Sequence, residues 1–106
     1  MLEGQVKIAF ANWYNSNREY SKNLPVTLNG FRRLHLSLQF GVYVDFFDSV
    51  GIEIMTPKKS ALIWSWHIRD NSIIKRINST LIFTSANEAQ SAALTKASQI
   101  FNERKT

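Results

Sequence analysis

The chain contains no cysteine, which excludes a disulfide framework, thiolate catalysis and the common cysteine-rich zinc sites. It also has no apolar run near the roughly 18–20 residues that a membrane-spanning helix needs. The first residues, Met1 to Lys7, show no basic region followed by an apolar stretch, so we expect no signal peptide. Together these absences predict a cytoplasmic protein with no membrane partner.

Catalytic and cofactor motifs are missing as well. The four glycines are isolated, so the chain has no glycine-rich phosphate loop. The two histidines, His35 and His67, stand in no catalytic or metal-ligating spacing. Asp45 and Asp48 could act as paired carboxylates, but the solvated side of an amphipathic helix explains them better. We therefore predict that the protein is not an enzyme and has no catalytic residue, metal, cofactor or small-molecule substrate.

The 106 residues suit a single domain, residues 1–106, with one hydrophobic core. An apolar fraction of 44% with 12% aromatic residues argues against disorder. The net charge of +5 favours an anionic partner such as nucleic acid. The thirteen Lys and Arg residues are spread along the chain in pairs at most, however, which is also typical of a solvated surface.

Residues 2–15 carry one apolar stripe at helical spacing, which predicts an amphipathic helix. The polar residues from Asn15 end it, and residues 16–33 then form a long connection with a turn signal at Pro25 and a short strand around 26–28. We accordingly divide the domain into an N-terminal helix and connection, 1–33, and a core, 34–106.

Residues 34–50 fit two patterns. Apolar residues alternate from Leu34 onward, as in a strand, yet the stretch also forms one apolar helical face. On that helix the small and acidic residues gather on the opposite side: Gly41, Asp45, Asp48 and Ser49. Because a strand would mix polar and apolar side chains on both faces, we favour a helix over about 38–50, capped by Ser37 and ended by Gly51.

Three strands are expected next. Residues 52–55 alternate as a first strand, and residues 56–60 supply a turn that contains proline. Residues 61–69 form a second strand, followed by a polar loop over 70–78. A short third strand over residues 80–84 has Leu81 and Phe83 pointing inward.

A helix closes the chain. Ser85 and Glu88 form a capping box at its start. The face that follows is mostly alanine and should lie close on a sheet: Ala86, Ala89, Ala93, Ala97, Ile100 and Phe101. Residues 103–105 should fray, with Arg104 and Lys105 suiting the negative helix terminus.

The predicted fold is therefore α+β, in two layers, with a three-stranded antiparallel sheet, helices packed on one face and the order α-α-β-β-β-α. Trp64 and Trp66 should be core residues beneath the alanine-rich helix rather than a stacking platform for bases. The other sheet face carries Met55, Ile63 and Ile82, and the first helix could cover part of it.

From Ser37 to Lys105 the predicted order is α-β-β-β-α, and the segment from Thr84 to Ala97 has a serine start and an alanine-rich stripe. This arrangement resembles the double-stranded RNA-binding domain, which implies phosphate contacts from a basic cluster at the start of the closing helix. The family's Gly-Pro-His-type hairpin is replaced here by residues 56–60. The positions that match the basic cluster carry no charge: Ala86, Asn87 and Gln90.

The stretch from Gln39 to Ile52, together with the closing helix, also resembles small proteins of Bacteroides-type bacteria and their mobile elements. That likeness implies no activity.

The best candidate site is electrostatic. In an up-down-up sheet the first hairpin tip, with Lys58 and Lys59, lies at the same end as the start of the last helix. Arg69, Lys75 and Arg76 cluster at the opposite end. We predict an accessory binding domain whose two basic ends straddle a nucleic-acid backbone.

The alternative is a protein-interaction or self-associating module. Its partner would be another protein or a second copy of the chain, bound through the uncovered sheet face with Ile63 and Ile82.

Overall fold

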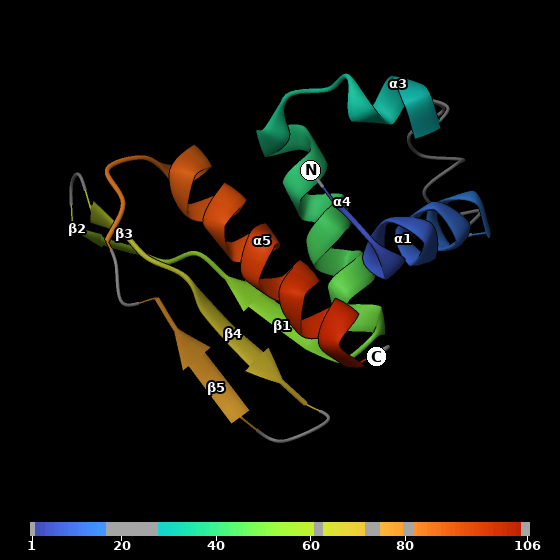
Figure 1. Cartoon of the computed structure of the whole chain (residues 1–106). Helices are drawn as coiled ribbons and strands as arrows, with labels where there is room; N and C mark the ends of the chain where they lie inside the picture. The colour runs from blue at the N-terminus through green and yellow to red at the C-terminus, as the bar shows by residue number, and fades with distance from the viewer. Residues whose placement is uncertain (1, 17–27, 61–62, 72–74, 80–81, 105–106) are drawn as a thin grey trace.

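The computed structural model describes residues 2–16, 28–60, 63–71, 75–79 and 82–104, without the side chains of Lys59 and Lys75. The fold is α+β, as predicted, with helices gathered on one face of an antiparallel sheet (Figure 1). The helices are α1 (Gln5–Ser16), α3 (Leu28–Arg32), α4 (Leu36–Ser49) and α5 (Ala86–Arg104). The strands are β1 (Ile52–Met55), β2 (Lys58–Ser60), β3 (Ile63–Trp64), β4 (His67–Asp70) and β5 (Lys75–Asn78).

The main sheet has three antiparallel strands in the order β1-β4-β5. Strands β2 and β3 pair separately and continue the hairpin of β1 and β4 past an interruption. At the interruption the Ser65 amide donates to the Pro57 carbonyl at 3.1 Å, and the Trp66 amide donates to Ser79 Oγ at 3.2 Å. The expected single strand over 61–69 is therefore two short strands, because these two bonds replace the regular ladder.

The third strand lies earlier in the chain than predicted. Residues 75–78, expected in a loop, form β5, in which Ile77 pairs with the fully buried Ile68 of β4. The expected strand over 80–84 is wrong as a member of the sheet, since Phe83 makes only an isolated bridge to Trp64. Thr80 and Leu81 lie outside the described residues.

Helix α5 packs on β1 and β4 through its alanine stripe (Figure 1). Ala89, Ala93 and Ala97 are fully buried, as expected for a helix whose backbone lies close on a sheet. At its start Ser85 Oγ accepts a hydrogen bond from the Glu88 amide at 3.2 Å, which confirms the serine cap.

The helices share a core of interlocked aromatic rings. The Phe10 ring lies 4.8 Å from that of Tyr43, 5.4 Å from Phe46 and 5.6 Å from Phe31, measured between centroids. The Tyr14 ring lies 5.1 Å from Phe31 and 6.0 Å from Phe10. These separations are in the range where aromatic pairs attract each other beyond the area that they bury. The cluster fixes how α1, α3 and α4 pack together.

Helix α4 confirms the helical interpretation of residues 38–50 and shows Gly41, Asp45, Asp48 and Ser49 on an exposed side. Gly51 follows it with φ of 81°, the left-handed conformation that glycine adopts without strain. The Ser37 cap is wrong, because the helix begins at Leu36, two residues before the predicted start, and His35 occupies the cap position.

Two further expectations about the connection and the first helix need correction. Leu28, expected in a strand with residues 26–27, begins helix α3, and residues 26–27 lie outside the described part. Helix α1 packs against α3, α4 and α5, so it belongs to the helical layer and does not cover the outer sheet face.

The end of α5 is anchored rather than frayed. Arg104 forms an ion pair with Asp70, whose side chain is 5% exposed, and its Nη1 donates to the Val50 carbonyl at 2.7 Å. A buried carboxylate needs such a partner, because burying a lone charge is costly. The fraying prediction is therefore wrong at Arg104, and Lys105 lies outside the described residues.

Asn102 joins α5 to the start of α1. Its Oδ1 accepts from the Val6 amide and its Nδ2 donates to the Glu3 carbonyl, both at 2.9 Å. Gly4 lies between them with φ of 76°, and a Cβ there would come within 3.2 Å of the Asn102 amide. The first turn of α1 is thus capped by a side chain from the other end of the chain.

Candidate nucleic-acid interface

The outer face of the main sheet displays six side chains in two cross-strand rows. Alternation along each strand places Ile52, Ile54 and Ile68 toward the helices, so the residues between them face outward. The register then aligns one row of Met55, His67 and Asn78, and a second row of Glu53, Arg69 and Arg76.

The second row brings two arginines together. Arg69 and Arg76 are direct register partners on β4 and β5, and both are exposed. Like charges directly opposite each other destabilise a sheet. Glu53 flanks Arg69 on β1, so one negative charge stands against two positive charges in this row. The row therefore carries an excess of one positive charge.

The first row is more tightly organised. His67 Nδ1 and Asn78 Oδ1 form a hydrogen bond across β4 and β5. Because an amide oxygen only accepts, the ring carries its proton on Nδ1. This bond fixes the imidazole plane at the sheet surface next to Met55, which is 47% exposed.

Lys58 lies toward the other end of the molecule. Its Nζ stands 5.5 Å from the centre of the half-buried Trp64 ring, within cation–π range. Trp64 exchanges two backbone hydrogen bonds with Phe83, of 2.7 and 2.8 Å, and Phe83 comes two residues before the cap Ser85. The chain therefore brings Lys58 toward the start of α5, as the sequence predicts.

The predicted site residues thus fall into two groups. Arg69 and Arg76 lie together at one end, with Lys75 in the same strand, while Lys58 and Lys59 belong to β2 at the other end (Figure 1). The turn expected over 56–60 is wrong at Lys58 and Lys59, because both residues are in a strand. Whether any of the five contacts nucleic acid stays a prediction.

The two tryptophans differ in burial. Trp66 is 9% exposed and joins the core, which confirms the prediction for it. Trp64 is half-buried and lies outside the core cluster, so the prediction is wrong for it; Lys58 Nζ lies over its ring instead.

Asp45 and Asp48 lie on the exposed side of α4, as the amphipathic interpretation predicts. Partial burial raises the pKa of Asp48, and the nearby carboxylates of Glu53 and Asp45 raise it further. Among the described residues no group of three or more acidic or histidine side chains could hold a metal ion.

The sequence did not predict one group of polar residues. Lys7, Arg32, Gln39 and Tyr43 come from three helices and line a common pocket. In the sequence this group is indicated only by Gln39, a polar residue on the otherwise apolar side of α4. In the structure its side chain is 9% exposed.

No protein-family model, no curated protein and no solved structure matches this chain. Within the ranges that the structure describes, no helix is long and apolar enough to cross a bilayer.

Proposed function

We propose that this chain is a non-enzymatic accessory domain that binds the phosphate backbone of a nucleic acid along its sheet. The observation that carries the proposal is the exposed Arg69–Arg76 pair on a sheet face that no described helix covers. Lys58 marks the second contact region, and Lys59 and Lys75 add charge within the same strands.

Guanidinium groups suit this task because each presents a planar set of donors that matches two phosphate oxygens. Two arginines held in register on neighbouring strands start from a fixed backbone spacing, so no main-chain rearrangement is needed to bring both to one phosphate group. Like-charge repulsion between them is relieved when a phosphate lies between or beside them. This geometry favours contacts to the backbone rather than to base edges.

The spacing of the two groups suits a nucleic-acid backbone. Arg69 and Trp64 are five residues apart along β4 and β3, about 17 Å if extended at 3.3 Å per residue. Phosphates that follow one another on a duplex strand advance about 3.4 Å along the duplex axis, so the two contact regions are far enough apart to meet different phosphates of one backbone.

The resemblance to the double-stranded RNA-binding domain supports the proposal only in shape. With the short strands β2 and β3 left aside, the order α4, β1, β4, β5, α5 corresponds to the order of elements on which the resemblance was based. The uncharged Ala86, Asn87 and Gln90 at the start of α5 cannot supply that family's phosphate grip. We therefore assign the phosphate contacts to the strands.

The test is fluorescence-anisotropy titration of labelled double-stranded RNA, single-stranded RNA and duplex DNA at about 50 and 200 mM salt, where phosphate contacts reveal themselves. We expect micromolar binding that weakens with salt. The double variant R69Q/R76Q should weaken binding at least tenfold and lower the salt slope by about two.

The matched control is R33Q/K96Q, which removes the same number of positive charges from helices and connections instead of the sheet. It should change affinity by less than about twofold if contacts, rather than net charge, decide binding. Equal losses in both double variants, or no binding at low salt, would overturn the proposal.

A second candidate is the self-associating or protein-interaction module. Of its predicted residues, Ile82 is 64% exposed but lies outside the strands, and Ile63 of β3 is half-buried, so the prediction that both lie on an uncovered sheet face is wrong. Met55 on the outer sheet face is 47% exposed, and a contact surface would have to join it with Ile82 in one apolar patch. This candidate predicts a dimer in sedimentation velocity that persists at high salt and that Ile82→Lys dissociates. A monomer at all concentrations would exclude self-association.

A further inference from the structure

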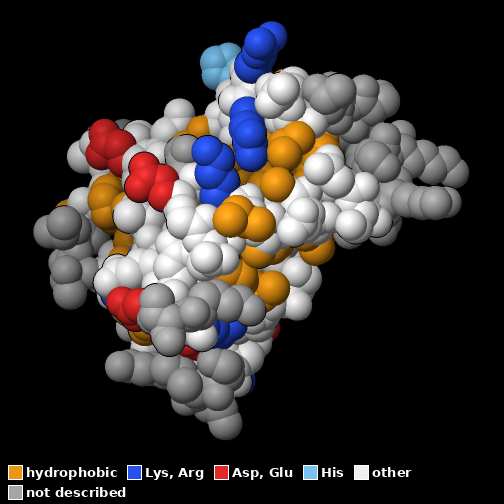
Figure 2. All heavy atoms as spheres, turned by 45° about the vertical axis from the view of Figure 1, so that its right-hand side comes forward, with side chains coloured by type: hydrophobic (Ala, Val, Ile, Leu, Met, Phe, Trp, Pro, Cys, Tyr) orange, Lys and Arg blue, Asp and Glu red, His pale blue; other side chains and the backbone are white. Residues whose placement is uncertain are grey.

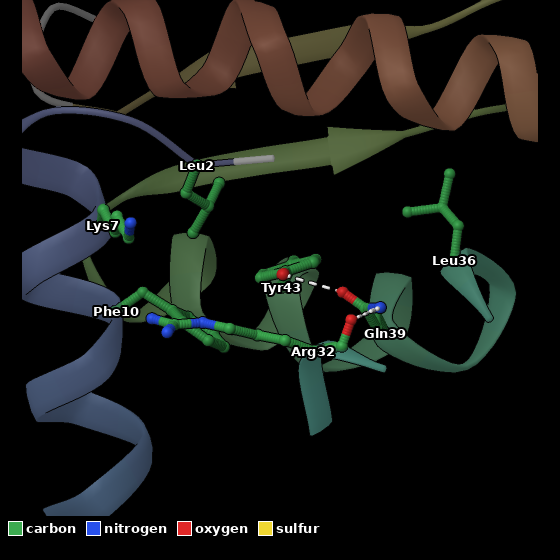
Figure 3. A pocket seen from close by; sticks show the side chains of 7 residues that line it. All are labelled: Leu2, Lys7, Phe10, Arg32, Leu36, Gln39 and Tyr43. Atoms are coloured by element: carbon green, nitrogen blue, oxygen red, sulfur yellow. Dashed lines mark hydrogen bonds between the residues drawn. The ribbon is translucent and has the colours of Figure 1, made fainter. Parts of the chain in front are cut away.

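A pocket of about 320 Å³ lies between α1, α3 and α4 (Figure 3). One part of its wall is apolar and consists of Leu2, Phe10 and Leu36. The other part is polar and consists of Lys7, Arg32, Gln39 and Tyr43. Its volume lies at the small end of the range for ligand-binding pockets, which argues for a small ligand.

The charge in the pocket is of one sign. Lys7 and Arg32 line it, and none of the described side chains that line it is acidic. Neither cation forms an ion pair with an acidic residue within the described ranges. Figure 3 shows the Arg32 side chain extending from α3 toward α1, where Lys7 and Phe10 lie. Both positive groups are therefore free to bind an anion.

A buried polar network holds Arg32 in place. Gln39 Nε2 donates to the carbonyl of Leu34 at 2.6 Å and to that of Arg32 at 3.2 Å. Gln39 Oε1 accepts from the Tyr43 hydroxyl at 2.9 Å. Every hydrogen of the Gln39 amide is thereby used, so the end of α3 is fixed to α4 (Figure 3).

Tyr43 stays protonated in this network. Burial raises the pKa of its hydroxyl, and the positive charge of Arg32 lowers it by a smaller amount. The hydroxyl therefore remains a donor to Gln39 at neutral pH, and its oxygen can still accept a hydrogen bond.

We propose that this pocket binds a small organic anion whose apolar body ends in a carboxylate or a phosphate group. Lys7 and Arg32 bind the anionic group, and Leu2, Phe10 and Leu36 contact the body. Figure 2, which brings the side of α1 and α3 forward, shows Lys and Arg side chains beside hydrophobic ones at the surface. A ligand with a charged end and an apolar body matches that neighbourhood better than a bare ion or a neutral apolar molecule.

The first experiment compares four probes by isothermal titration calorimetry on the full chain. Benzoate and phenyl phosphate carry the two candidate anionic groups on the same ring and distinguish between them. Benzyl alcohol has the ring without the charge, and inorganic phosphate has the charge without the ring. We expect one or both aromatic anions to bind at least tenfold more tightly than either of the other two probes.

The second experiment locates the binding. Arg32→Gln and Lys7→Gln should each weaken the best probe by about tenfold, because each removes a charge-assisted hydrogen bond. Arg33→Gln is the matched control: Arg33 follows Arg32 directly, is exposed and does not line the pocket. It should change the affinity by less than about twofold. All three positions are exposed, so the variants should stay folded, which far-UV circular dichroism checks.

Three results would overturn the proposal: no binding of either aromatic anion at millimolar concentration, equal binding of benzyl alcohol, or equal losses in Arg32→Gln and Arg33→Gln. R69Q/R76Q should leave probe binding unchanged, because those residues lie on the sheet. The pocket and the nucleic-acid proposal can therefore fail independently.

Discussion

The side of the molecule formed by α1, α3 and α4 is held by interlocked aromatic rings, whereas the sheet side has one apolar face and one open face. In the helical half, Phe10 alone contacts five other rings and is 2% exposed. In the sheet half the apolar face consists of Ile52, Ile54 and Ile68, and the outer face carries exposed or half-buried side chains that are polar except for Met55. Ring packing therefore determines how the helices of the helical half are arranged. In the sheet half the arrangement depends on a few hydrogen bonds.

This difference assigns most of the stability to the helical half and the open binding surface to the sheet half. A surface that must meet a partner cannot also be buried, so the sheet leaves its outer face open and is secured from behind by α5. The helical half buries its aromatic cluster, although Ile8 and Leu38 are exposed on its surface, and a partly polar pocket lies between α1, α3 and α4.

The largest effect should come from the ring cluster. Phe10→Ala should lower the free energy of unfolding by about 3–5 kcal/mol, because it leaves a cavity bordered by five rings. Phe83→Ala in the sheet half is the control: this ring is half-buried and should cost roughly half as much. Urea unfolding measures both variants. Equal losses of unfolding free energy in Phe10→Ala and Phe83→Ala would show that ring packing does not stabilise the helical half more than the sheet half.

The next largest effect concerns the ion pair behind the sheet. Arg104→Ala removes the ion pair of the buried Asp70 carboxylate and should cost about 2–3 kcal/mol. Adding Asp70→Asn should recover much of that loss, because a neutral amide is cheaper to bury than a carboxylate that has lost its ion pair. A double-mutant cycle in urea shows whether the two losses are coupled. Simple additivity would mean that the pair contributes little.

A smaller effect is expected at the start of α5. Ser85→Ala removes the acceptor for the Glu88 amide and should cost about 1 kcal/mol in thermal or urea unfolding. Thr95→Ala is a control within the same helix: its hydroxyl donates to the Ser91 carbonyl in the exposed helix interior. That replacement should be neutral or slightly stabilising. If Ser85→Ala and Thr95→Ala change the unfolding free energy by the same amount, the Ser85 cap does not stabilise the helix.

The smallest effect should appear at Asp48. Its pKa is raised above the ordinary value of 3.8, so the folded state holds the proton more tightly than the unfolded state. Stability therefore falls as pH rises from 3.8 to the higher pKa of the folded state, and the ionised carboxylate is unfavourable at neutral pH. Asp48→Asn should raise the unfolding free energy at pH 7 by less than about 0.5 kcal/mol.

The gain from Asp48→Asn should vanish at pH below 3.8, where the carboxyl is protonated in both states. Glu88→Gln provides a control of opposite sign, because this carboxylate lies in the first turn of α5 and favours the helix. A loss of stability in Asp48→Asn at pH 7 would show that the carboxylate makes a favourable contact.

The helices were largely predictable because their signals are local. The polar residues Asp45 and Asp48 gather on one side of α4 only if the stretch is helical, and Ser85 with the alanines that follow marks α5. The strands were harder. Strand β5 has one apolar residue, Ile77, among three polar ones, so its sequence looks like a loop until β4 pairs with it.

The interruption of the long predicted strand could not be foreseen either. It depends on bonds from Ser65 to Pro57 and from Trp66 to Ser79, whose partners are eight and thirteen residues away. The residues of the sheet face and of the pocket differ in the same respect, namely how far apart they lie in the sequence. Arg69 and Arg76 are close in sequence around one hairpin, whereas Lys7, Arg32 and Tyr43 meet only because the aromatic rings pack their helices together.

The Asn102 amide has a consequence for how the molecule opens. It holds the Val6 amide and the Glu3 carbonyl, so the first turn of α1 exists only while the end of α5 is docked. Native-state hydrogen exchange would then find α1 and α5 in one cooperative unit, although they lie at opposite ends of the sequence. Proteolytic access to either helix would require both to leave together. The sheet edge at β5 could meanwhile open on its own.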